Sequence, residues 1–271
     1  MSNDFRDDAI VLHVKNWQTA DKYAVCFTRE HGKIRFIIYG GRYPKNVAGR
    51  LLQPFAQLSV EVNGGQRIDK LKSCELLEMP QAFDFKQMAY AAVVTELTAV
   101  FTEDHQPQAE VYELLNETLK LLRERNPRIV VLSFALKLLE LVGLSPQVEA
   151  CVVCGCEHAE EDAWFSPLQG GMICNDCHNV TGEEKFSSGT RKLLNHLKNL
   201  DFQNPAPFSA SSCAVLARSS KLMVLWFPQP ENTGWWLACT VCYKACPSEA
   251  VYTKWILPLF LQIHWNTERS K

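Results

Sequence analysis

A chain of 271 residues, 47% of them hydrophobic, is long enough to bury more than one core, so its length favours two or three domains. The formal net charge is −2, but residues 1–75 hold twelve Lys and Arg against eight Asp and Glu, which gives +4 there and leaves −6 for the rest. The N-terminal part is therefore the better candidate for binding an anion. No basic-then-apolar leader pattern opens the chain, and its apolar stretches are too short or too charged to span a bilayer. We expect a cytoplasmic protein without membrane attachment.

Residues 1–79 predict a small β-barrel. Short apolar runs, several of them alternating with polar residues, are separated by Gly and Asn-Gly turns, which is typical of strands joined by tight hairpins. The five runs cover residues 9–14, 23–28, 34–39, 58–62 and 68–77. Because a barrel of this size fills its interior with side chains, a ligand must bind on its outer face or loops.

Basic residues cluster inside this predicted barrel, within a stretch where Glu30 is the one acidic residue. Aromatic residues lie among them, so the barrel could present a positive groove that pairs with phosphates and stacks on bases of single-stranded nucleic acid. The alternative is an ordinary solvated face, as most charge runs are. The predicted DNA-contacting residues are Arg29, Lys33, Arg35, Arg42, Lys45, Arg50, Phe36, Tyr39 and Tyr43.

Residues 80–147 change to a helical period. Apolar residues recur three and four apart in three stretches, which predicts three amphipathic helices packed as a bundle. Pro107 and Pro127 stand where first-turn prolines belong, and Gly143 with Pro146 ends the last helix. A further helix is expected between residues 183 and 200, after a Ser187-Ser188 cap, and we assign it to the same helical domain.

Two cysteine pairs between residues 148 and 182 predict a zinc module. Cys151-x2-Cys154 and Cys174-x2-Cys177 are separated by nineteen residues that include a Gly-Gly turn, so a short hairpin could bring the pairs together. Four thiolates fill a tetrahedral Zn²⁺ and leave no position for water, which indicates a structural ion. The alternative is a set of reduced thiols, and the nearby Cys156, His158 and His178 could also replace a ligand.

Residues 201–271 break with the composition of the rest. They hold five of the seven tryptophans and four of the eleven cysteines, without a sustained helical or alternating pattern. Cys239, Cys242 and Cys246 imitate the last three ligands of a bacterial ferredoxin motif, but Trp236 stands at the first ligand position. We favour accidental spacing over an iron–sulfur cluster completed by Cys213. A frameshift or true divergence would each produce such a tail.

The order of these motifs resembles the bacterial RecO family. The resemblance runs from about residue 6 to about residue 200 and fails beyond, where the family would have a closing amphipathic helical segment. It is carried by Tyr39-Gly40-Gly41-Arg42-Tyr43-Pro44-Lys45, by Leu139-Glu140-Leu141-Val142-Gly143-Leu144-Ser145-Pro146, by Cys151-x2-Cys154-Gly155, and by Phe165-Ser166-Pro167-x2-Gly170-Gly171-x2-Cys174-x2-Cys177.

The resemblance implies an α+β multidomain protein: an OB-fold barrel that binds DNA, then a helical bundle domain that carries a zinc module with four cysteine ligands. It implies a recombination mediator of the RecF pathway, cytoplasmic and nucleoid-associated, and not an enzyme. Such proteins bind single- and double-stranded DNA, anneal complementary strands, cooperate with RecR and contact the C-terminal tail of single-stranded DNA-binding protein. The four cysteines carry over as zinc ligands, and Arg42 and Lys45 as DNA contacts.

Two rival functions stay open at this point. A zinc-ribbon adaptor that binds only proteins would share the cysteine pairs and the bundle, but it would not require a basic barrel. An enzyme is less favoured, because the sequence holds no GxSxG, HExxH, P-loop or GxGxxG pattern. A DNA-binding measurement separates the adaptor from the mediator.

Overall fold

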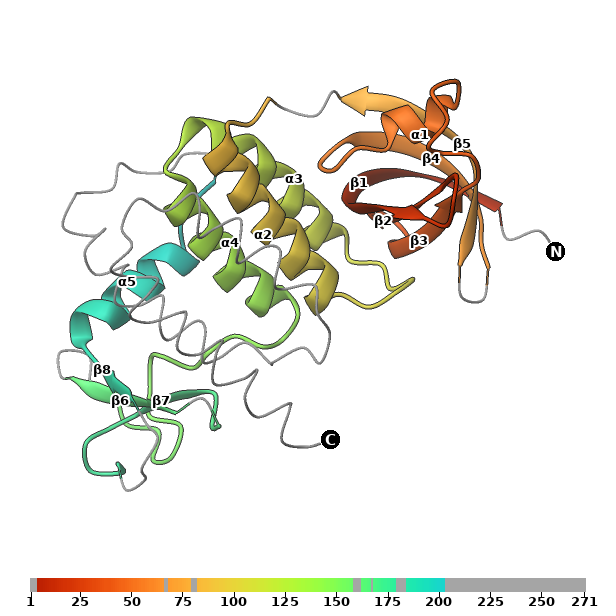
Figure 1. Ribbon diagram of the computed structural model, residues 1–271. Helices are drawn as coiled ribbons and strands as arrows, with labels where there is room; N and C mark the ends of the chain where they lie inside the picture. Colours follow the sequence, from red (N-terminus) through yellow and green to blue (C-terminus); the bar gives the residue numbers. More distant parts are fainter. Residues whose placement is uncertain are drawn as a thin grey trace, which may run out of the picture. The chain divides into compact units, whose positions relative to one another are not determined.

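The computed structural model describes residues 4–65, 68–78, 82–157, 162–166, 168–178 and 184–202 (Figure 1). The chain divides into two compact units, Met1–Leu144 and Ser145–Lys271. The tail that the sequence singled out, with Cys213, Cys239, Cys242 and Cys246, lies outside the described residues apart from positions 201 and 202. The barrel and the first helices thus share one unit, and the expected domain boundaries after residues 79, 147, 182 and 200 stay predictions.

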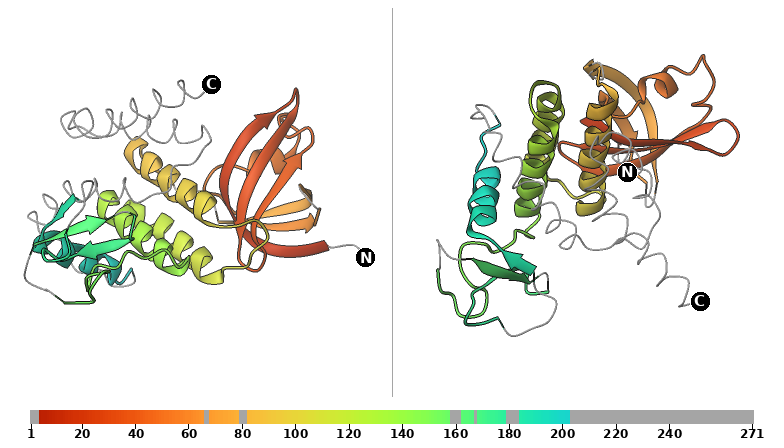
Figure 2. Two further views of the ribbon diagram at one scale, coloured as in Figure 1. Left: turned by 90° about the horizontal axis from the view of Figure 1, so that it is seen from below. Right: turned by 60° about the vertical axis from the view of Figure 1, so that its left-hand side comes forward.

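Five strands of the first unit close into a barrel in the order β1-β2-β3-β5-β4. The strands are β1 (Asp4–Trp17), β2 (Asp21–Thr28), β3 (Gly32–Ile38), β4 (Gln57–Asn63) and β5 (Asp69–Glu78), and the short helix α1 (Val47–Leu51) lies between β3 and β4. Neighbouring strands are antiparallel except β3 and β5, which run parallel. Figure 2 shows how the strands curve to form the barrel. The predicted OB-like barrel is confirmed.

A β-bulge in β1 decides which of its side chains face outwards. Val11 pairs with Cys26 of β2 but His13 pairs with Val25, so one extra residue is inserted between them. Val11 lies in the barrel core before the bulge, and Val14 packs against that core after it. Because successive side chains of a strand point to opposite faces, Lys15 and Trp17 then lie on the outside, where both are exposed.

The helices α2 (Phe85–Phe101), α3 (Ala109–Glu124) and α4 (Pro127–Leu141) lie side by side (Figure 1). Asp84 and Gln87 form a capping box at the start of α2. Asn126 caps α4, and Pro127 occupies its first turn as the sequence predicted. Pro107 does not: α3 begins at Ala109 with Gln108 as its N-cap residue, so the proline precedes the cap.

The second unit contains a three-stranded sheet in the order β7-β6-β8, followed by α5. The elements are β6 (Ala163–Ser166), β7 (Gly171–Ile173), β8 (Glu184–Phe186) and α5 (Ser188–Lys198). β6 and β7 form the expected hairpin around the glycine pair. Gly171 is required there by close packing, since a Cβ atom would lie 2.5 Å from Cγ1 of Val152 and 2.6 Å from the carbonyl oxygen of Gln147. The side chain of Ser187 accepts a hydrogen bond from Thr190 N and so caps α5.

Within the parts of the chain that the structure describes, no helix has both the length and the apolar character needed to cross a membrane.

Candidate metal centre and nucleic-acid interface

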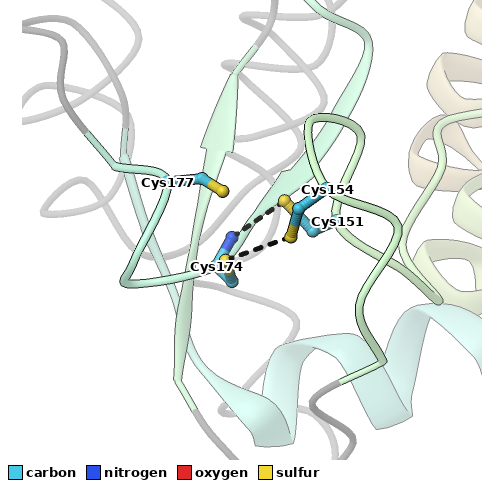
Figure 3. A group of neighbouring side chains, drawn as sticks. All are labelled: Cys151, Cys154, Cys174 and Cys177. Atoms are coloured by element: carbon cyan, nitrogen blue, oxygen red, sulfur yellow. Dashed lines mark hydrogen bonds between the residues drawn. The ribbon is translucent and has the colours of Figure 1, made fainter.

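The four predicted cysteine ligands come together in the second unit. Cys151 and Cys154 lie in the turn-rich segment before β6, and Cys174 and Cys177 follow β7. Their Sγ atoms all lie within 4.8 Å of one another (Figure 3). The Sγ atoms of Cys154 and Cys174 are 3.7 Å apart. A tetrahedral site with zinc–sulfur bonds of about 2.3 Å separates its sulfur atoms by about 3.8 Å, so the cluster has the size that a metal ion requires.

Backbone N–H groups donate to the cluster and favour the thiolate form of Cys151. Burial alone would raise the pKa of Cys151, but the backbone N–H groups of Cys154, Cys174 and Val153 donate to its sulfur and lower the pKa to about 6. The donor–acceptor distance from Cys174 N to Cys151 Sγ is 3.4 Å (Figure 3). Hydrogen bonds to the charged form favour a thiolate, which is the form that binds metals.

The pKa values of the neighbouring thiols are shifted in different directions. The sulfur atoms of Cys154 and Cys156 are 3.0 Å apart, and the hydrogen bond between them lowers the pKa of Cys154. The same hydrogen bonding to Cys154 raises the pKa of Cys156, and it raises the pKa of Cys177 to about 12. The thiolate form is therefore favoured at Cys151 and Cys154, and Cys177 would have to lose its proton for a cation to bind there.

The residues that could replace a ligand are placed differently. Cys156 touches the cluster through Cys154 but is not one of the four grouped sulfur atoms. The ring of His178 stacks on Trp164, with centroids 3.7 Å apart and planes inclined by 2°. His158 lies outside the described residues. Gly155 has φ 74°, which lets the backbone turn directly after Cys154.

The barrel presents an exposed basic loop, residues 39–45, between β3 and α1. Tyr39 is 69% exposed and Tyr43 62% exposed, and Arg42 and Lys45 are exposed beside them. Arg50, in α1, is exposed as well. All five side chains are exposed, so a ligand from solution can reach them.

Hydrogen bonds fasten this basic loop to the turn between β1 and β2. Arg42 donates from its backbone N to Ala20 O at 2.9 Å and from Nη1 to Thr19 O at 2.7 Å. Gly40 N donates to Oδ1 of Asp21 at 2.8 Å. Asn46, the N-cap residue of α1, donates from Nδ2 to Tyr39 O at 3.0 Å. These hydrogen bonds hold the loop in a defined conformation.

The structure removes Phe36 and Lys33 from the predicted DNA surface. Phe36 is 0% exposed and lies in the barrel core, because its neighbours Arg35 and Ile37 point to the outer face. Lys33 does point outwards but is only 5% exposed, since its ammonium group is covered by the end of α2. Neither side chain can stack on a base or pair with a phosphate.

Arg29 and Arg35 are half-buried and already face carboxylates. The guanidinium group of Arg29 donates a hydrogen bond to Glu113 of α3. It also lies over the ring of Tyr112, 5.3 Å from the centroid. Arg35 pairs with Asp104 at 3.1 Å. Both carboxylates lie far along the chain from their arginine partners, so the local sequence around the basic cluster could not predict these ion pairs.

One group of residues was missed by the sequence analysis. Nζ of Lys15 lies 5.5 Å from the ring centroid of Trp17 and 4.9 Å from that of Tyr23. Lys15 and Trp17 stand two residues apart, which places them on one face of a strand, but the bulge before them concealed that this is the outer face.

Comparison with known proteins finds a family match for both halves of the chain. A family profile described as "Recombination protein O N terminal" matches residues 1–80, and one described as "Recombination protein O C terminal" matches residues 82–226. The chain belongs to the RecO family. The predicted resemblance is confirmed, with one correction: the C-terminal match reaches residue 226, so the likeness does not fail at residue 200.

Individual relatives agree with this assignment. The protein from Symbiobacterium thermophilum named "DNA repair protein RecO" is 33% identical over 203 residues, which cover 72% of this chain and 80% of that protein. The one from Desulforamulus reducens is 32% identical over 71% of this chain and 77% of its own length. The one from Bifidobacterium animalis subsp. lactis is 29% identical over 64% and 74%. As a member of this family, the protein is a recombination mediator and not an enzyme.

Proposed function

We propose that this protein binds single- and double-stranded DNA on the outside of its barrel, anneals complementary strands, and helps load recombinase together with RecR. The observation that carries the proposal is the basic loop, with two largely exposed tyrosines beside exposed basic side chains. Annealing needs positioned strands and no bond chemistry. RecR and the C-terminal tail of single-stranded DNA-binding protein are the protein partners that family membership suggests.

The proposed DNA contacts are a smaller set than the sequence predicted. Arg42, Lys45 and Arg50 supply positive charge, and Tyr39 and Tyr43 supply rings. Phosphate contacts release counterions and dominate non-specific affinity, so a local group of exposed cations can bind DNA although the whole chain has a net charge of −2. Because the rings can stack on any base, we expect little dependence on sequence.

We further propose that the four-cysteine cluster holds one structural Zn²⁺. The sulfur spacing and the N–H donors to Cys151 support this choice. Four thiolates complete the coordination, so the ion would contribute folding free energy to the second unit and would offer no open position for catalysis.

A filter-binding titration tests the DNA proposal. Single-stranded and duplex oligonucleotides of one length are titrated at two salt concentrations with the parent protein, Lys45→Glu and Arg42→Glu. Each variant should bind both DNA forms more weakly, and each lost contact should reduce the slope of log affinity against log salt by about 0.7 to 0.9. Lys45→Glu is the cleaner variant, because Arg42 also fastens the loop to Thr19.

The matched control is the single charge reversal Lys86→Glu, at an exposed position of α2 outside the barrel strands. This control should bind like the parent. Annealing of complementary strands, followed by a fluorescence-transfer pair, should decline in the order of DNA affinity. If the parent binds neither DNA form in low salt, the protein-binding adaptor is the better interpretation.

A further inference from the structure

The outer face of the barrel carries two aromatic rings and a lysine at the hairpin of β1 and β2. We name Lys15, Trp17 and Tyr23 the hairpin platform. The ring centroids of Trp17 and Tyr23 are 5.8 Å apart with planes inclined by 35°. Nζ of Lys15 lies 4.9 Å from the centroid of Tyr23. Trp17 is 36% exposed, so part of its ring is open to a ligand.

Strand register places these side chains on one face. Lys15 lies directly opposite Tyr23, Trp17 opposite Asp21, and Tyr23 opposite Ile37 of β3. The next residues along these strands point the other way: Ala24, beside Tyr23, and Phe36, beside Ile37, belong to the barrel core. The platform therefore faces outwards as a single surface.

This surface continues into the basic loop. The carboxylate of Asp21, the partner of Trp17, accepts the backbone N–H of Gly40, and Ala20 O accepts that of Arg42. Tyr39 follows β3 directly and is exposed. Backbone hydrogen bonds thus join the end of the β1–β2 hairpin to the basic loop, and the Asp21 carboxylate accepts one of them.

We infer that the hairpin platform stacks the bases of single-stranded DNA and makes this barrel prefer single strands over duplex. The inference rests on the proposed function and names the substrate form that the site selects. Bases within a duplex cover each other's faces, so they offer their phosphates but not their rings to a flat surface. Cations such as Arg42 and Lys45 bind either form, whereas Trp17 and Tyr23 gain contact only with unpaired bases.

The experiment compares three ligands of equal length and charge per strand: oligo(dT), an abasic strand of the same length, and a duplex. Two variants keep an apolar side chain at position 17 but differ in the ring: Trp17→Phe and Trp17→Leu. The parent and Trp17→Phe should bind oligo(dT) more tightly than the abasic strand. Trp17→Leu should lose about tenfold or more in affinity for oligo(dT), the effect of one lost base stack, with unchanged affinity for the abasic strand and the duplex.

Tyr23→Leu is the second variant, expected to act in the same direction, and Lys45→Glu is the control that weakens all three ligands. Thermal unfolding and zinc content confirm that each variant is folded. If Trp17→Leu binds all three ligands like the parent, the platform is not a stacking site, although DNA binding itself stands. An equal loss for all three ligands would likewise overturn the inference, since it would mean that the rings only support the loop. Failure of the parent to bind any ligand would instead remove the proposed function.

Discussion

The ammonium group of Lys33 in β3 donates to the carbonyl oxygen of Thr102, the C-cap residue of α2, at 2.5 Å. It donates also to Ala99 O at 2.6 Å. A helix C-terminus carries unpaired carbonyl groups and a partial negative charge, both of which a lysine satisfies. Burial lowers the pKa of Lys33, while the nearby Asp104 works against that shift. This basic residue therefore joins the barrel to the helices of the same unit.

Lys33→Met should destabilise the first unit. It removes the charged donor and leaves two carbonyl groups at the end of α2 without their partner, so the free energy of unfolding should fall by about 2 to 4 kcal/mol. Urea unfolding followed by circular dichroism measures the change. The exposed Lys45→Met, as a control, should alter stability by less than about 0.5 kcal/mol. Equal stability of the two variants would contradict a capping role for Lys33.

Cys174→Ser should abolish metal binding. The parent should contain about one zinc per chain, and the variant close to none, because serine is a poor ligand for zinc and three thiolates remain. Metal analysis after dialysis gives the number, and a chelator should unfold the second unit of the parent. Cys156→Ser is the matched control, since Cys156 lies beside the cluster but outside the four grouped sulfur atoms. It should keep the full equivalent of zinc; loss of zinc in this variant would make Cys156 a ligand.

Gly171→Ala should damage the hairpin that holds the second cysteine pair. The added methyl group would lie within 2.6 Å of both a Val152 methyl group and the backbone oxygen of Gln147, and backbone cannot move aside cheaply. Gly170→Ala is the comparison: that residue has φ 71° but open space around it, so its cost should be about 1 kcal/mol of backbone strain. Zinc affinity and thermal unfolding should decline much more for position 171. The reverse order would mean that conformation, and not packing, governs this turn.

Tyr112 should make the first unit less stable in alkali. Burial is the main cause that raises the pKa of its phenol to about 12, and Asp8 adds to it. A raised folded-state pKa means that the stabilising effect is complete below pH 10 and is lost as the pH rises towards 12, by about 2 to 3 kcal/mol. Tyr112→Phe should remove this part of the decline. Unfolding free energies of parent and variant at pH 9 and pH 11 provide the test, and parallel curves would contradict it.

The sequence was informative where one local pattern determines the outcome. Cysteine spacing identified the four clustered sulfur atoms, because ligand geometry restricts how far apart the pairs can be. Alternating apolar residues indicated the barrel strands. The DNA surface was harder, because whether a basic or aromatic residue is free depends on distant parts of the chain. Lys33 and Arg35 meet the segment after α2, and Phe36 points inwards by strand alternation that composition alone does not reveal.

The bulge in β1 determines which side chains of that strand lie on the surface of the barrel. Leu12 sits at the register shift, and every side chain after it changes face relative to those before it. Deleting Leu12 would place His13 directly after Val11, and plain alternation would keep Val14 inside and Lys15 outside. Pairing the full strand without the bulge would instead turn Lys15 and Trp17 towards the core and Val14 towards water. A homologous chain that is one residue shorter here could therefore keep the direction of the hairpin platform with a regular strand, whereas a chain of this length needs the bulge to present the same side chains to a ligand.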